Sequence, residues 1–172
     1  MPFIEVPDGD GANLERLFSL RPEVYAAWRE LVTAVKATSD ERRYELATLA
    51  AARRLRSSYC SLAHGKVLAE QFYDFESVAA FPDGLDGADR AIMAFAEKVV
   101  ADATAITQAD VDELRAHGLG DGEIFDVVLA ATIRCFFSKT LDALGVQPDA
   151  EFAELDPGFR GPLTVGRPIE TA

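Results

Sequence analysis

The chain has 172 residues, of which 49% are hydrophobic and 27% are charged, which is typical of a globular protein with one sizeable core. Its formal net charge of −12 disfavours nucleic acids and anionic membranes as partners, and we expect neither. No apolar run approaches the ~20 residues that would cross a bilayer, and the opening residues do not resemble a secretory signal, so we expect a cytoplasmic protein.

The sequence predicts an all-α chain, organised as a single domain over residues 1–172. Pro and Gly residues near the start indicate an extended arm at about 1–11, and Pro22 suits the first position of a helix that ends near residue 37. Ser39 or Asp40 can cap the next helix. Further helices are predicted over about 58–72, 74–80, 86–105, 108–116 and 123–144. The Pro- and Gly-rich end predicts an irregular tail at about 148–172.

The last long helix, predicted from Glu123 to about Leu144, is strongly apolar, and we expect it to be central. It carries Cys135 in an apolar run with Phe136 and Phe137. Core packing is therefore the ordinary interpretation of Cys135. Two cysteines make no disulfide framework, which favours a reducing compartment.

The stretch from Glu45 to Gly65 contains the residues that point to chemistry. Cys60 and His64 are four positions apart, so a helix places thiol and imidazole on one face. Ser57 can cap that helix at its N-terminus, which puts the sulfur near the positive end of the helix dipole. The imidazole of His64 and the positive end of the helix dipole both favour a thiolate at Cys60, the form that attacks peroxides and disulfides.

Glu45 belongs to the preceding helix, among leucines and alanines. We expect its carboxyl group to be partly desolvated, which would raise its pKa toward a range useful for proton transfer. It can orient His64 or pass it protons through a water. The ordinary interpretation of Glu45 is a solvated helix residue.

These residues also carry a family resemblance. The pattern of Glu45, then Ser57-Ser58-Tyr59-Cys60, then His64 resembles the signature of the alkyl hydroperoxidase D-like (AhpD-like) and carboxymuconolactone decarboxylase superfamily. That signature has a Glu, a Cys-x-x-Cys, and a His four residues after the second Cys. The segments 114–119 and 141–146 are similar to the C-terminal half of these proteins, closest to the peroxidase-related subgroup, and the resemblance spans about Arg21 to Asp149.

The resemblance implies an AhpD-like fold with an antiparallel helix pair that carries the site, in a homo-oligomer. It implies a thiol-dependent alkyl hydroperoxide reductase in which Cys60 attacks, His64 and Glu45 move protons, and Ser57 and Tyr59 contact the substrate. Partners would be a small hydroperoxide and an external thiol or dithiol reductant, and no cofactor or metal is expected. Ser57 stands where the family has its resolving Cys. Resolution would then fall to Cys135 or to an external thiol, or redox activity would be lost.

Two alternatives stay open at this point. One is a carboxymuconolactone decarboxylase-like enzyme that uses the pocket for acid–base chemistry without redox cycling, although that class generally lacks the Cys. The other is a non-catalytic oligomeric scaffold. For single residues the plainer interpretations are a packing role for Cys60, a plain core or capping histidine for His64, an N-cap for Ser57 and a packing role for Tyr59.

Overall fold

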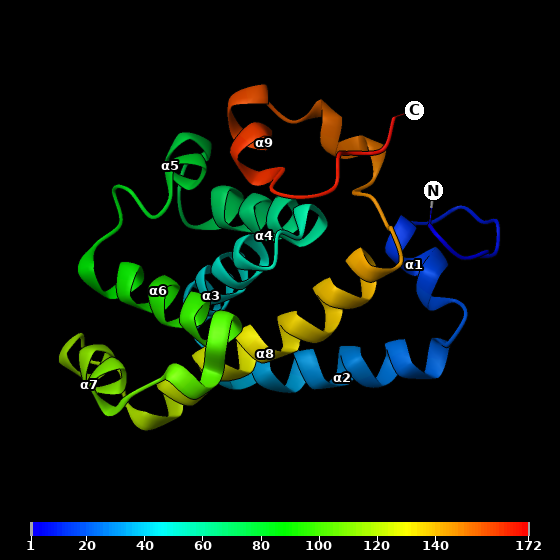
Figure 1. Cartoon of the computed structure of the whole chain (residues 1–172). Coiled ribbons are helices and arrows are strands. Elements are labelled where there is room, and N and C mark those ends of the chain that lie inside the picture. The colour runs from blue at the N-terminus through cyan, green and yellow to red at the C-terminus, as the bar shows by residue number, and fades with distance from the viewer. Residues whose placement is uncertain (1, 172) are drawn as a thin grey trace.

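The computed structural model describes residues 2–171, and within them every regular element is helical (Figure 1). The α-helices are α1 (Asn13–Phe18), α2 (Pro22–Thr38), α3 (Glu41–Arg54), α4 (Ser58–Gln71), α5 (Phe75–Ala80), α6 (Gly87–Asp102), α7 (Gln108–Ala116), α8 (Asp121–Ala143) and α9 (Pro157–Leu163). Short 3₁₀ helices cover Ala103–Ala105 and Ala150–Glu154. The all-α prediction is confirmed, and no helix within residues 2–171 combines the length and apolar character that a bilayer span requires.

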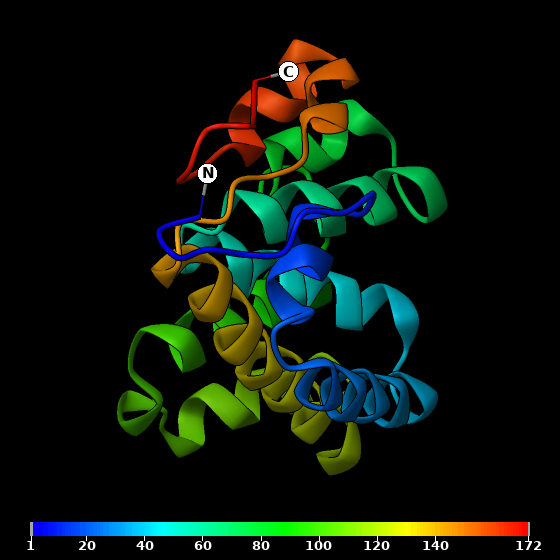
Figure 2. The ribbon, with the colours of Figure 1, turned by 90° about the vertical axis from the view of Figure 1, so that its right-hand side faces the viewer.

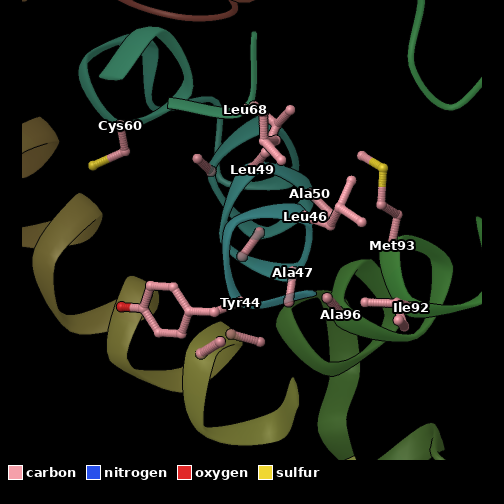
Figure 3. Packing of buried hydrophobic residues seen from close by; sticks show 14 of the residues in the cluster. Tyr44, Leu46, Ala47, Leu49, Ala50, Cys60, Leu68, Ile92, Met93 and Ala96 are labelled. Atoms are coloured by element: carbon pink, nitrogen blue, oxygen red, sulfur yellow. The ribbon is translucent and has the colours of Figure 1, made fainter. Parts of the chain in front are cut away.

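The centre of the molecule is α3, which packs against α4, α6 and α8. Residues 44–52 are all buried, because short alanine side chains on several faces let neighbouring helices approach from every side. Figure 3 shows Leu46 and Ala50 directed toward α6 while Tyr44 is directed toward α8. The helix α8, expected to be central, packs against α2, α3 and α6, but one of its faces leaves Phe125 and Phe136 60% and 47% exposed.

A tight turn at residues 55–57 sends α4 back along α3. Asp40 caps α3 as predicted, by accepting a hydrogen bond from the Arg43 amide at 2.9 Å. Within the turn, Arg56 adopts a positive φ of 58°, the left-handed conformation that closes the connection. Side chains near the start of α3 and in the second turn of α4 are thereby brought face to face, as an antiparallel pair requires.

The C-terminal segment, predicted to be irregular, contains α9 instead. Asp156 caps this helix, and Pro157 occupies its first position, where proline is well tolerated. Phe159 and Leu163, four residues apart, are both buried, and α9 packs against α4 and α5. The sequence did not predict this helix, because Pro162 stands inside it and proline normally interrupts a helix.

The two ends of the chain lie at the same end of the molecule (Figures 1 and 2). The Phe3 amide donates to the Leu144 carbonyl at 2.7 Å, and Asn13 Nδ2 donates to Glu170 Oε2 at 2.8 Å. Beyond α9 the chain crosses the start of α4, where the Gly166 amide donates to Ser58 Oγ at 2.8 Å. The C-terminal segment therefore packs against the helix that carries the cysteine.

Candidate functional site

Cys60 is the third residue of α4 and is buried, with 2% of its surface exposed. Its sulfur is directed away from α3 and toward α8 (Figure 3). There Arg134 Nη1 donates a hydrogen bond to Cys60 Sγ at 3.3 Å. A sulfur in contact with a guanidinium is in a polar setting, unlike a cysteine that only fills space in a hydrocarbon core.

Arg134 is the residue of this site that sequence reasoning missed. It is 3% exposed, and it extends from α8, which packs against α3, to Cys60 of α4. Burial opposes its charge, but the interactions with Cys60 and Tyr44 outweigh it, so the pKa of Arg134 lies above its usual value. The signal was a single basic residue inside an otherwise apolar run of α8. A buried arginine is rarely left without a partner.

Glu45 and His64 form the second pair of the site. Glu45 is 1% exposed, and its Oε2 lies 2.5 Å from His64 Nδ1. Its other oxygen accepts a hydrogen bond from Lys36 Nζ of α2 at 2.9 Å. Three helices thus contribute to one buried carboxylate, and the contribution of α2 through Lys36 was not predicted from the sequence.

The expectation of a raised Glu45 pKa is wrong. Burial alone would raise it, but His64 and Lys36 together lower the pKa of Glu45 to about 2. Glu45 is therefore a carboxylate at neutral pH. It can accept hydrogen bonds and hold His64 in place, but it does not carry a transferable proton.

His64 is held as a neutral imidazole. Burial and the nearby charge of Arg134 lower its pKa, and they outweigh the opposing effect of Glu45. Since Glu45 accepts at Nδ1, that nitrogen carries the ring proton, and Nε2 keeps a free lone pair. The side chain is 18% exposed, more than that of Glu45.

The structure divides the predicted trio between two pairs, Glu45 with His64 and Cys60 with Arg134. Glu45 and His64 are in direct contact, while the hydrogen bond to Cys60 comes from α8. Cys60 and His64 share one face of α4, as their spacing predicts. The charge of Arg134 acts on both pairs, since it lowers the His64 pKa and contacts the sulfur.

The two predicted substrate contacts occupy different places. Ser57 precedes α4 in an extended conformation, so it holds the N-cap position, but its side chain makes no capping hydrogen bond. Its hydroxyl lies near the carboxylate of the half-buried Asp142. Neither Ser57 Oγ nor Asp142 Oδ2 forms a hydrogen bond with good geometry. The Tyr59 hydroxyl donates a hydrogen bond to the Asp149 carboxylate. The Tyr59 ring packs edge-on against Phe152, with 6.0 Å between the ring centroids. These are packing contacts, and a substrate role for either residue stays a prediction.

Cys135 is half-buried, and burial raises the pKa of its thiol. The sequence placed Cys135, Phe136 and Phe137 together in the core. In the structure Phe136 is exposed, and of the three only Phe137 is buried. One residue along a helix turns the side chain by about 100°. Arg134, not Cys135, occupies the α8 position that faces Cys60.

Within residues 2–171, no group of three or more His, Cys, Asp or Glu side chains is arranged to hold a metal ion. The Glu45–His64 pair has Lys36 as its third neighbour, and a cation there competes with any metal.

Comparison of the sequence with protein-family models and with curated proteins finds no match. Among solved structures, an uncharacterized peroxidase-related protein with an alkylhydroperoxidase AhpD core, from Ralstonia eutropha JMP134, has a TM-score of 0.76 at 19% identity. The match covers 88% of this chain and 94% of that one. An uncharacterized peroxidase-related protein from Silicibacter sp. TM1040 has a TM-score of 0.71 at 18% identity, with 88% and 93% covered.

The debrominase Bmp8, in a variant form solved in complex with 2,3,4-tribromopyrrole, is similar as well, with a TM-score of 0.68 at 16% identity. That match covers 88% of this chain and 80% of Bmp8. The chain therefore has the AhpD-like fold, as its motif predicts. The same fold carries a debrominase, so the fold alone does not fix the reaction.

Proposed function

We propose that the protein is a thiol-dependent oxidoreductase that reduces a small hydroperoxide through Cys60. The observation that carries this proposal is the hydrogen bond from buried Arg134 to Cys60 Sγ at 3.3 Å. A guanidinium interacts more strongly with a thiolate than with a thiol, and the thiolate is the attacking form. A cysteine that served packing alone would not need a buried cation beside it.

The proton chemistry would belong to His64. Its free Nε2 accepts the proton of the Cys60 thiol, and the thiolate then attacks one oxygen of the peroxide. A sulfur–oxygen bond forms and the oxygen–oxygen bond breaks, so the sulfur is oxidised to sulfenic acid and the peroxide is reduced. His64 returns its proton to the departing alkoxide or hydroxide. Glu45 orients the ring and stabilises the transient imidazolium.

The reductant would be an external thiol. Ser57 cannot form a disulfide, and Cys135 follows Arg134 on the helix instead of facing the sulfur. A thiol that attacks the sulfenic acid releases water and leaves a mixed disulfide, and a second thiol regenerates Cys60. A small thiol suits the 2% exposure of Cys60 better than a protein dithiol does.

The other functions receive less support from this site. A decarboxylase-like reaction would depend on His64 alone for proton transfer, because a Glu45 with a pKa of about 2 cannot supply a proton at neutral pH. A scaffold without activity would have no use for a neutral histidine, an ionised glutamate and an arginine-bound thiol in one place. Similarity to the debrominase makes a halogenated ring the second substrate to try.

We also propose that the protein is a homo-oligomer. Apolar side chains lie exposed along α8 and α2, with Phe125 60%, Phe136 47% and Leu31 49% exposed. Phe125 and Phe136 are about three helical turns apart and therefore share one face of α8, and contiguous exposed apolar surface marks interaction sites. Light scattering after gel filtration gives the mass, and a monomer at micromolar concentration would contradict this proposal.

Hydrogen peroxide and a sulfenic acid trap test the main proposal. The reduced protein is treated with one equivalent of peroxide, with and without dimedone, and its intact mass is measured. Trapped sulfenic acid should appear in the wild type and in Cys135→Ser and be absent from Cys60→Ser. Tribromopyrrole replaces peroxide in a parallel sample. Wild-type protein that peroxide leaves unmodified would overturn the proposal.

A further inference from the structure

Helices α3, α4 and α8 each carry buried polar atoms that lack a hydrogen-bond partner. Within residues 2–171, Arg134 Nε, Ser138 Oγ, Ser61 Oγ and Thr48 Oγ1 have no hydrogen-bond partner. The three hydroxyl residues are 0% exposed and Arg134 is 3% exposed. A buried donor left unpaired costs about 1–3 kcal/mol, so such an atom next to the sulfur is a candidate to bind a reactant.

Helical spacing places two of these atoms, Arg134 Nε and Ser138 Oγ, on the side of α8 that reaches the sulfur. Ser138 is four residues after Arg134, so both lie on the face of α8 that reaches Cys60. Ser61 directly follows Cys60 on α4, so its side chain is turned by about 100° from the sulfur. Thr48 is three residues after Glu45, on the face of α3 that reaches His64. We refer to Arg134 and Ser138 as the polar seam.

The charge of the polar seam indicates what it would hold. Arg134 is its only ionised member, and it is already oriented by the contact with sulfur. It retains donors beyond Nη1, including the unpaired Nε. Arginine has five N–H donors, and hydroxyl groups can donate or accept. The set therefore suits an oxygen-rich group that becomes negative next to the sulfur.

We propose that Arg134 is a further catalytic residue and that the polar seam binds the two oxygens of the peroxide. This inference rests on the proposed function. As the thiolate attacks the nearer oxygen, negative charge moves from sulfur to the farther oxygen, which leaves with the electron pair of the broken bond. Arg134 faces this charge throughout, and Ser138 holds the farther oxygen until His64 protonates it.

Arg134 and Ser138 should consequently act on different reactions of the same sulfur. Arg134 stabilises the thiolate, so it promotes attack on any electrophile. The Ser138 hydroxyl touches only the peroxide, so it promotes oxidation and leaves alkylation by iodoacetamide unchanged. The ratio of the two rate constants separates a peroxide-binding role from a general effect on the thiol or on folding.

The test measures both rate constants at pH 7 in protein that carries Cys135→Ser. Oxidation by hydrogen peroxide is followed by dimedone-quenched mass spectrometry, and alkylation by iodoacetamide is followed by intact mass. The variants are Arg134→Met, Ser138→Ala and, as a control, Thr132→Ala, which removes an exposed hydroxyl from the outer face of α8.

We expect Ser138→Ala to lower the ratio of oxidation to alkylation at least about threefold, and Arg134→Met to slow oxidation at least about tenfold, which is the loss of a hydrogen bond to a charged group. Thr132→Ala should match the parent. If Arg134→Met does not fold, the Ser138→Ala ratio decides the question alone. If peroxide oxidises the parent protein and Ser138→Ala has the same ratio of oxidation to alkylation as the parent, this inference alone is overturned. If peroxide does not oxidise the parent protein, the proposed function is overturned.

Discussion

Replacing His64 with glutamine should abolish a loss of stability that the wild type undergoes on mild acidification. Burial and Arg134 lower the pKa of His64 in the folded protein, whereas in the unfolded chain it titrates near 6.5. Below pH 6.5 the unfolded chain therefore binds a proton that the folded protein resists, and acid favours unfolding. The stability that depends on neutral His64 is complete above pH 6.5 and falls as the pH decreases below it.

The size of the effect follows from one proton. The free energy of unfolding changes by at most about 1.4 kcal/mol per pH unit for each proton bound on unfolding. Between pH 7.5 and 5.5 the wild type should thus lose up to about 1.4 kcal/mol through this residue. Glu45 does not disturb the comparison in this range, because its pKa in the folded protein is about 2. Glutamine can still donate a hydrogen bond to that carboxylate.

Urea denaturation at pH 7.5, 6.5 and 5.5 measures the effect. The matched control is His117→Gln, since His117 is the other of the chain's two histidines and is exposed. His64→Gln should be less sensitive to pH than the wild type, and His117→Gln should behave like the wild type. A wild type that gains stability over His64→Gln as the pH falls would mean that His64 is an imidazolium paired with Glu45, and would refute the neutral-base role.

Three further predictions concern the surroundings of the site. Glu45→Ala should cost about 1–3 kcal/mol in urea denaturation, because it leaves His64 Nδ1 without its hydrogen-bond acceptor, whereas Glu41→Ala at the exposed start of α3 should cost far less; equal effects would contradict the buried pair. Gly166→Ala should loosen the C-terminal segment, because a Cβ there would lie 1.9 Å from the Arg56 carbonyl oxygen; limited proteolysis that matches the wild type would argue against it. Cumene hydroperoxide should oxidise Cys60 far more slowly than hydrogen peroxide does, and equal rates would show an open site.

The helical frame could be predicted because it depends on local signals. The Asp40 cap, the spacing of Cys60 and His64, and Gly145 with its φ of 79° just after α8 are all readable in order along the chain. The contact between Glu45 and His64 was expected from the family motif. It needs only a tight turn between two consecutive helices, and the structure supplies it.

The remainder of the site could not be predicted because its contacts are distant in sequence. Arg134 is 74 positions from Cys60, and no local pattern indicates which face of α8 meets α4. Lys36 lies on a largely exposed helix, where a lysine is ordinarily solvated. Without these two cations, burial among alanines suggested a raised Glu45 pKa. The sign of that shift was decided by charges from other helices.

The most direct test of the central claim compares Cys60 with itself in two states of the same chain. In Cys135→Ser protein, the rate constant for oxidation by hydrogen peroxide is measured at pH 7 in buffer and again after unfolding in urea. The account predicts faster oxidation in the folded protein, despite the 2% exposure of the sulfur, because Arg134 and His64 activate it. Slower oxidation in the folded protein would mean that the helices only shield Cys60, and would contradict a catalytic site.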